Sequence, residues 1–306
     1  MDNIPILLLG YNRDDLLEKR VKEISKLEIN KIYISIDGGK ESYKPEMTNL
    51  ISKIPSLFSS TTQVKITHHQ DNLGLTKHVT HSISKILKEN ENIIVVEDDV
   101  ALNTNFYKNM AHGINLLNEM GCDGLVSAFS PINYSGNHLI RNKWRKSIYF
   151  SCWGWGCSRS TWEKYDSDLS KTDLNTALEN SQSWNNLSLR QKNVWKARFE
   201  RVQKNQSYTW DLQMQFASFL NEFTNLAPLY RFVDNEGFND ERATHTREPK
   251  PRWMSKKPIN QQKINSIAGS AITKFYNQLD ELLIAGDSEL VSIYESVKKY
   301  FKSKKI

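Results

Sequence analysis

Strand-length apolar runs alternate with helix-length amphipathic segments over the first 130 residues, and this alternation constrains the fold more than any other feature. Apolar side chains in the longer segments recur every three or four residues, which is the spacing of one helix face. Strands that are separated by helices pair in parallel through right-handed crossovers. We therefore predict an α/β fold with a mixed, mainly parallel sheet flanked by helices. The expected strands are 4–9, 31–36, 64–67, 92–96 and 124–129, and the expected helices are 14–27, 76–87 and 105–120.

The regular alternation ends after residue 130. We expect one further strand, a loop rich in charge and proline, and four further helices, of which the last two form a C-terminal helical extension. No internal repeat and no low-complexity linker requires a second independent domain. The strand is expected at 147–151, the loop at 236–257, and the helices at 188–204, 211–220, 272–284 and 288–301.

Composition is that of an ordinary globular protein, with 39% hydrophobic and 25% charged residues. The formal net charge is +6, and the basic excess lies in 250–257 and 298–305. Basic segments attract nucleic acid or anionic lipid. No nucleic-acid-binding motif accompanies them, so we expect no nucleic-acid partner. The basic tail can contact an anionic membrane, although a solvated helix end is the simpler explanation.

The three cysteines are an odd number in a long chain, which favours a reducing compartment. The apolar run at 4–9 is too short for the core of a signal peptide, and no stretch approaches the length of a membrane span. These features predict a cytoplasmic protein.

Glu97, Asp98 and Asp99 follow the expected strand 92–96 directly and are the strongest chemical signal. Ligands of open α/β sheets bind at the carboxyl ends of the strands. Adjacent carboxylates repel one another, and a hard divalent cation such as Mn²⁺ or Mg²⁺ relieves that repulsion. We therefore predict a metal at Asp99, where it would bridge phosphates. A solvated turn, or a cap for the next helix, is the alternative.

Two other strands also end in polar residues. Tyr11 and Arg13 follow the first strand and Asp37 follows the second, so an arginine–phosphate pair and a carboxylate–base contact are both possible there. Lys77 follows the third strand and can reach a phosphate. The chain has no G-x-G-x-x-G after its first strand and no P-loop, which argues against a dinucleotide oxidoreductase and a P-loop NTPase. A surface arginine and a turn aspartate are the simpler alternatives.

Further candidates lie in the second half of the chain. Asp211, at a helix start beside Trp210, could deprotonate a hydroxyl group, or it could simply favour the helix dipole. His245 could complete a metal or phosphate site, or be an ordinary surface histidine. Trp153 and Trp155 offer flat faces suited to sugar rings, with core packing as the alternative. The histidines at 68, 69, 78 and 81 form only a weak metal pattern.

Together these segments resemble the GT-A glycosyltransferases, which have a Rossmann-like fold, and especially bacterial enzymes similar to N-acetylglucosaminyltransferase I and the GT2-like group. The segment from Val95 to Val100 resembles the family's acidic metal motif, and that from Ile6 to Arg13 resembles its first strand with a nucleotide-contacting arginine. Asp37 matches a uracil-contacting aspartate, and Trp210-Asp211 matches the segment that holds the catalytic base. The likeness is good over the first 130 residues, loose as far as His245, and absent beyond about residue 255.

The resemblance implies an inverting hexosyl- or N-acetylhexosaminyltransferase that moves a sugar from a UDP-sugar to a glycan or lipid-linked glycan, as in bacterial surface polysaccharide synthesis. It implies Mn²⁺ (or Mg²⁺) on Asp99, ribose on Asp98 and Asp211 as base, with Glu97, Trp153 and Trp155 beside the donor sugar and acceptor. It also implies a catalytic domain at 1–255, with a nucleotide-binding half at 1–130 and an acceptor half at 131–255, and an extension at 256–306. A sugar nucleotidyltransferase and a non-catalytic glycan-binding protein are the alternatives.

Overall fold

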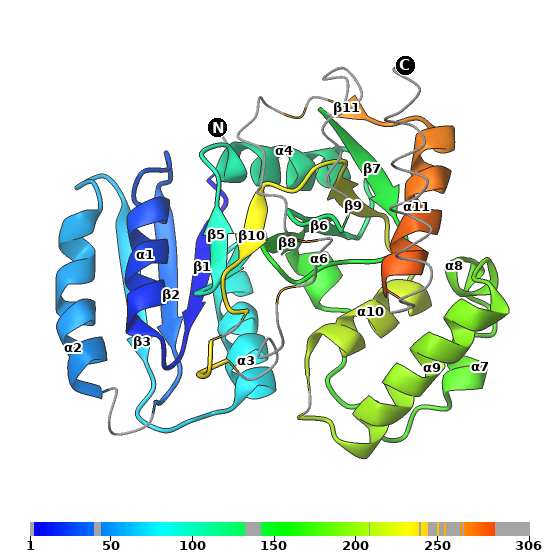
Figure 1. Cartoon of the computed structure of the whole chain (residues 1–306), viewed down its shortest axis with the longest axis horizontal. Coiled ribbons are helices and arrows are strands. Elements are labelled where there is room, and N and C mark those ends of the chain that lie inside the picture. The colour runs from blue at the N-terminus through cyan, green and yellow to red at the C-terminus, as the bar shows by residue number, and fades with distance from the viewer. Residues whose placement is uncertain are drawn as a thin grey trace.

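The computed structural model describes residues 3–39, 44–131, 142–207, 209–238, 240–243, 250, 254, 264 and 266–284. One sheet runs through the molecule with helices on both faces (Figure 1). Its first half contains β1 (Ile6–Gly10), β2 (Lys31–Ile36), β3 (Gln63–His68) and β4 (Asn92–Glu97). These strands pair in parallel in the order β4-β1-β2-β3, as the sequence predicts.

The inner strand β1 is apolar without interruption because helices cover it on both sides. Ile6 and Leu8 belong to the core on one face, and Leu7 and Leu9 belong to the core on the other. A strand that is buried on both faces has no polar side to show, which explains its continuous hydrophobic run.

One face of the sheet is covered by α1 (Asp14–Ile24), α2 (Lys44–Lys53) and α4 (Phe106–Glu119). The other is covered by α3 (Leu75–Leu87), α6 (Arg159–Trp162) and α10 (Asp211–Leu220). The helices α1, α3, α4 and α10 lie where the sequence predicts them. Helix α2, with the short 3₁₀ helix Ile54–Leu57 after it, was not expected.

The sheet continues beyond β4 with strands of both directions. These are β8 (Trp155–Ser158), β6 (Leu125–Ser127), β9 (Asn225–Pro228), β7 (Lys143–Ser147) and β11 (Ser266–Ile267), in that order across the sheet. Strand β8 lies antiparallel between β4 and β6. The whole sheet is therefore mixed and mainly parallel, as predicted.

The predicted strand at 147–151 is wrong, because β7 ends at Ser147. The hydroxyl of Ser147 donates to the carbonyl of Tyr149 at 2.7 Å and accepts from its amide at 3.2 Å. Side chains of Gln215 and Ser127 accept from the amides of Phe150 and Ser151. Hydrogen bonds to side chains thus replace the strand ladder over these residues.

A smaller group of helices projects from the second half of the chain (Figure 1). It consists of α7 (Leu174–Leu178), α8 (Gln182–Asn185) and α9 (Leu189–Lys204), packed against α10. Trp195, Phe199 and Phe219 form its core together with Tyr149, which stacks on Trp195. A capping box at Ser188 and Gln191 fixes the start of α9, one residue after the predicted start.

Strands β5 (Val100–Leu102) and β10 (Val233–Asn235) form a separate antiparallel pair beside the end of β4. The helix α11 (Ser270–Ile284) lies where the first closing helix is predicted. The second closing helix, at 288–301, lies outside the described residues. No helix within the described residues combines the length and the hydropathy that crossing a bilayer requires.

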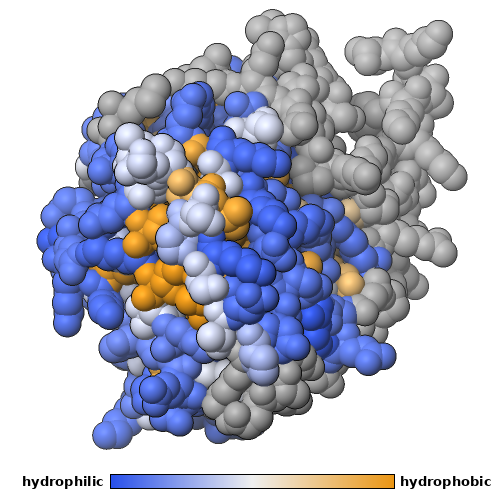
Figure 2. Space-filling model, turned by 90° about the vertical axis from the view of Figure 1, so that its left-hand side faces the viewer, coloured by the Kyte–Doolittle hydropathy of each residue, from blue (hydrophilic) through white to orange (hydrophobic). Residues whose placement is uncertain are grey.

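Figure 2 views the molecule from the side of α2 and β3 and shows a small apolar area inside a polar surface. Strand β3 is the last strand at this edge of the sheet, and its Val64 and Ile66 are partly buried against the core. The acidic triplet and Arg13 lie away from this apolar area, at the carboxyl ends of β4 and β1.

Candidate functional site

The acidic triplet forms a tip at the carboxyl end of β4, held by the main chain on two sides. The amide of Asp98 donates to the carbonyl of Leu9 at 3.0 Å, which continues the pairing of β4 with β1. The carbonyl of Asp99 accepts from the amide of Glu236, just after β10, at 2.7 Å. Asp98 and Asp99 are both buried, and Glu97 is partly exposed. The chain therefore presents three acids at a fixed position on the ligand-binding edge of the sheet.

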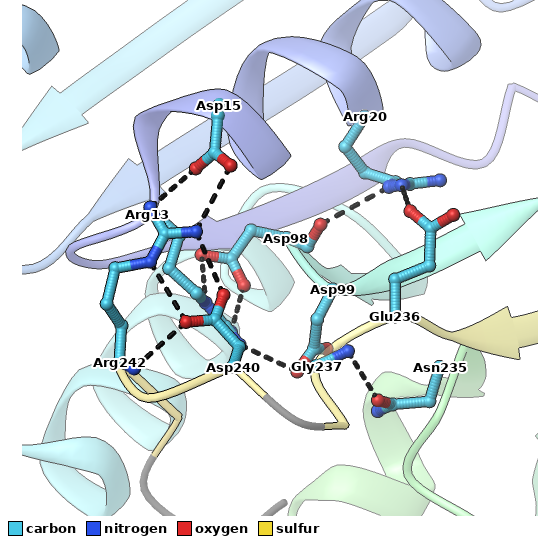
Figure 3. Close-up of polar contacts among 10 residues, drawn as sticks. All are labelled: Arg13, Asp15, Arg20, Asp98, Asp99, Asn235, Glu236, Gly237, Asp240 and Arg242. Carbon is cyan, nitrogen blue, oxygen red and sulfur yellow. Dashed lines mark hydrogen bonds and ion pairs between the residues drawn. The ribbon is translucent and has the colours of Figure 1, made fainter. Parts of the chain in front are cut away.

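Arg13 reaches the tip from the end of β1 (Figure 3). Its Nη2 forms a short ion pair with Asp98 Oδ1, its Nε donates to Asp98 Oδ2 at 3.3 Å, and its Nη1 lies 3.1 Å from Asp99 Oδ2. One guanidinium thus joins two adjacent carboxylates, in the forked geometry that arginine allows. The sequence predicts these residues at one edge, and the structure brings them into direct contact.

Loss of solvent dominates the electrostatics of the tip. Burial raises the pKa of Asp98 to about 7 and outweighs the opposite effect of Arg13. Burial, followed by the charges of Asp99 and Asp98, raises the pKa of Glu97 well above its ordinary value. A second positive charge at this tip would favour the ionised acids.

One oxygen of the tip has no hydrogen-bond partner. Asp99 Oδ1 is buried and unpaired among the described residues, although its sister oxygen contacts Arg13. A buried carboxylate oxygen without a donor is costly, and a hard cation is the ligand that satisfies it best. Nowhere in the described part of the chain do three His, Cys, Asp or Glu side chains form a cage. Asp99 therefore fits a cation that takes its other ligands from phosphate and water, as Mg²⁺ commonly does.

The predicted ligand His245 lies outside the described residues. The chain just before it is described: Arg242 pairs with Asp240 and with Asp15 of α1, at 2.9 and 2.7 Å (Figure 3). These ion pairs fix the segment 240–243 beside α1 and close to Arg13, whose charge also lowers the pKa of Asp240.

Sequence reasoning missed Arg20, which is fully buried on α1. Its Nε donates to the carbonyl of Asp98 at 3.3 Å, and its Nη atoms pair with Glu23 and Glu236. A signal was available, because Arg20 falls within the apolar stripe of Leu17, Val21 and Ile24. A charged residue in such a stripe needs buried partners.

Asp37 follows β2, as predicted, and organises the loop that leads into α3. Its two oxygens accept from the amides of Gly38, Leu73 and Gly74 at 2.8–3.1 Å. Gly38 is required here, since a Cβ atom would lie 2.2 Å from the main chain of Asp71. Two further predicted nucleotide contacts lie at the ends of this loop. They are Tyr11, whose hydroxyl accepts from Asn72 at 2.7 Å, and Lys77, which is exposed.

Asp211 begins α10 and accepts a short hydrogen bond from Thr209. Its charge reaches the acidic tip, because it contributes to the raised pKa of Glu97. The pKa of the Cys152 thiol is raised by burial and then by the charges of Asp211 and Glu97, so both carboxylates lie near it. Burial lowers the pKa of Arg198 on α9, and the charge of Asp211 acts in the opposite direction. Asp211, Glu97 and the tip thus belong to one charged region. No sequence pattern indicates that Cys152 and Arg198 also belong to it.

The two predicted tryptophans lie on opposite sides of a glycine turn. Gly154 has φ +66°, which a residue with a side chain adopts only with strain. Before it, Trp153 is partly exposed and packs edge-to-face on Phe129 and Phe238. After it, Trp155 is fully buried and stacks on Trp210, so it has no surface to offer a ligand.

No known protein family matches the sequence, and no curated protein sequence matches it. Solved structures are similar at low identity. A mannosyltransferase, PcManGT from Pyrobaculum calidifontis, in complex with GDP-Man and Mn²⁺, is 12% identical, with a TM-score of 0.40 over 71% of this chain and 69% of its own. UDP-glucose pyrophosphorylase complexed with UDP-glucose is 10% identical, with a TM-score of 0.39 over 75% of this chain and 91% of its own.

TarS from S. aureus is 14% identical, with a TM-score of 0.33 over 46% of this chain and 24% of its own. TM-scores at this level do not assign the chain to the family of any of these proteins. The function must therefore be argued from the site itself.

Proposed function

We propose that this protein is a glycosyltransferase of the GT-A type that uses a nucleoside-diphosphate sugar, such as a UDP-sugar, and a divalent cation. The observation that carries the proposal is the buried, unpaired Oδ1 of Asp99 at the carboxyl end of β4. That oxygen lies in a group of three acids with one arginine, and a carboxylate at the start of α10 faces the same region.

Asp99 would hold Mn²⁺ or Mg²⁺, and His245 is a further candidate ligand. The cation, when bound, supplies positive charge to the diphosphate leaving group. Arg13 and Lys77 provide the other positive charges at this edge. Arg13 is held at the tip, whereas Lys77 is exposed at the start of α3 and free to turn toward a phosphate.

The nucleoside would lie across the ends of β1 and β2. Tyr11 offers a ring surface there, Asp37 fixes the loop beneath it, and Asp98 offers a carboxylate to the ribose hydroxyls. The oxygens of Asp37 already accept main-chain hydrogen bonds, so its contribution to a base would use their remaining lone pairs.

Asp211 acts as the base in this proposal. It takes the proton of an acceptor hydroxyl, whose oxygen forms a bond to the anomeric carbon of the donor. The bond between that carbon and the phosphate oxygen breaks, and the nucleoside diphosphate leaves with its electrons, which inverts the configuration. Trp153 offers a partly exposed ring for a glycan acceptor, and Glu97 offers a polar group between the donor sugar and Asp211.

The decisive experiment is Asp99→Asn, which keeps the shape of the side chain and removes its charge. We expect Mn²⁺ affinity, measured by electron paramagnetic resonance, to fall by roughly 100-fold or more, exceeding the usual loss from an outer-shell partner. Turnover of nucleotide sugars should fall with it, and the folded structure should persist. Glu91→Gln, an exposed acid at the other end of β4, is the control. Mn²⁺ binding that is equal in wild type and Asp99→Asn would refute the proposal.

A further inference from the structure

We infer that Arg13 has two alternative partners, the tip carboxylates and the donor diphosphate, and that its exchange between them couples cation binding to nucleotide binding. This inference rests on the proposed function. The first position is the one that the structure shows, with the guanidinium on Asp98 and Asp99.

Arg13 and a cation at the tip would use the same acids. Arg13 contacts both oxygens of Asp98 and one oxygen of Asp99. The remaining oxygen, Asp99 Oδ1, is the one available to a cation. A cation on Oδ1 would therefore share its carboxylate with a guanidinium, and two positive groups on one carboxylate repel each other.

The guanidinium of Arg13 is held at the tip with little contact with solvent. Its side chain is only 14% exposed, so this repulsion is weakly screened by solvent and salt. Arg20 cannot replace Arg13 at the tip carboxylates, because its guanidinium is engaged by Glu23, Glu236 and the carbonyl of Asp98. When a cation binds without nucleotide, repulsion by the charge of Arg13 therefore lowers its affinity for the tip.

The backbone conformation of Arg13 allows its side chain to move. It precedes α1 with φ −123° and ψ 74°, outside the helical conformation, so its side chain can turn without unwinding the helix. Asp240, in the segment 240–243, lies near Arg13 (Figure 3), and the two opposite charges attract each other. A diphosphate at the strand ends gives the guanidinium a forked anionic partner equivalent to the carboxylates it leaves.

The consequence is positive coupling between the two ligands. A nucleoside diphosphate that draws Arg13 away raises the affinity of the tip for the cation, and the cation raises the affinity for the nucleotide by the same factor. Arg13 would thereby weaken the binding of a cation in the absence of the nucleotide-sugar donor.

The test measures Mn²⁺ binding to full-length wild type and Arg13→Gln by electron paramagnetic resonance, with and without UDP, corrected for the Mn²⁺ that UDP binds in solution. In wild type, UDP should tighten Mn²⁺ binding by roughly 10-fold, within the usual range of coupling between sites. Arg13→Gln should bind Mn²⁺ alone more tightly than wild type, and UDP should tighten its Mn²⁺ binding by a smaller factor than in wild type. Arg13→Lys, which keeps the charge and loses the fork, should lie between the two.

Thermal unfolding and circular dichroism establish that each variant is folded. Mn²⁺ affinity in folded Arg13→Gln that equals or falls below the wild-type value, with the UDP effect retained, would overturn the inference and leave the metal site intact. No Mn²⁺ binding in wild type, Arg13→Gln and Arg13→Lys alike would refute the proposed function itself. Lys22→Gln, which removes an exposed cation of α1 outside the tip, is the matched control and should retain wild-type coupling.

Discussion

The amide of Glu236 donates to the carbonyl of Asp99 at 2.7 Å, and this hydrogen bond joins the acidic tip to the chain that follows β10. The side chain of Glu236 continues the connection, since it accepts from Lys19 at 2.6 Å and from Arg20 at 2.8 Å. Both lysine and arginine belong to α1, so Glu236 links the tip to that helix (Figure 3).

Replacement of Arg20 by Met should therefore destabilise the protein. Arg20 is fully buried, and its removal takes one donor from each of Glu23, Glu236 and the carbonyl of Asp98. We expect the free energy of unfolding to fall by about 3 kcal/mol, the low end for a broken buried ion pair, because the two glutamates are partly exposed. Urea denaturation measures this change.

Lys19→Met is the matched control, because Lys19 contacts the same glutamate from an exposed position. Its effect should stay within about 0.5 kcal/mol, as for most surface ion pairs. Equal losses in the two variants would show that Arg20 has no special role in holding the tip.

Asp211→Asn should abolish most transfer without weakening the binding of the cation. Asparagine keeps the position of the side chain and cannot take a proton from the acceptor. We expect turnover to fall by roughly 100- to 10,000-fold, the range for general bases, while Mn²⁺ and UDP affinities stay near wild type. Thr209→Val removes only the hydroxyl that donates to Asp211 and should cost less. Wild-type turnover in Asp211→Asn would exclude it as the base.

His78 should make the fold less stable in mild acid. It is buried and hydrogen-bonded to Ser35, and burial lowers its pKa to about 4, with His69 and His81 acting in the same direction against Asp37. An unfolded histidine takes its proton near pH 6.5. Between these values the unfolded chain binds a proton that the folded chain excludes, so stability is present above about pH 6.5 and is lost as pH falls toward 4.

The expected loss from this one group is on the order of 3 kcal/mol. His78→Gln should remove that part of the pH dependence, whatever it does to stability at pH 7. Denaturation of wild type and His78→Gln at pH 7 and pH 4.5 measures it, with the exposed His81→Gln as control. Parallel pH profiles of wild type and His78→Gln would contradict the assignment.

The ion pair of Arg145 and Asp280 should decide how firmly α11 is attached to β7. Both side chains are at most 2% exposed, and Asn277 also accepts from Arg145 at 3.0 Å. Arg145→Met or Asp280→Leu alone should cost about 3–5 kcal/mol, since each leaves a buried charge unpaired. The double variant should cost less than either single one. Additive losses in a double-mutant cycle would contradict this.

The order of elements in the first half was predictable because local periodicity and burial agree there. The sequence pattern does not predict helix α2, because Pro45 and Pro55 lie near its two ends. Met47, Leu50 and Ile54 nevertheless recur at helical spacing. Pro45 lies in the first turn, where a missing amide costs nothing. The sequence pattern does not predict strand β8 either, because Trp-Gly-Cys is typical of a turn. Only its pairing with β4 and β6 makes this segment a strand.

The site was predictable only in part, for a similar reason. Parallel strand order places Arg13, Asp37 and the acidic triplet at one edge of the sheet, so their shared location follows from the sequence. The pairing of Arg13 with both aspartates could not be predicted, because it depends on how far the arginine side chain extends from the end of β1 to the end of β4. The hydrogen bond from Glu236 to Asp99 depends on the pairing of β10 with β5. These segments are far apart in the sequence, and no local pattern encodes their contact.

The reversed direction of β8 has a consequence for altering this protein. In a parallel strand the chain reaches the ligand edge after the strand, but β8 reaches it before, so the segment 147–154 ends beside the tip. Engineers who wish to change which acceptor enters could lengthen or exchange that segment, upstream of the strand, and leave the diphosphate end untouched. Under the proposed function, a loop graft there should alter acceptor selectivity with less effect on the cation site at Asp99.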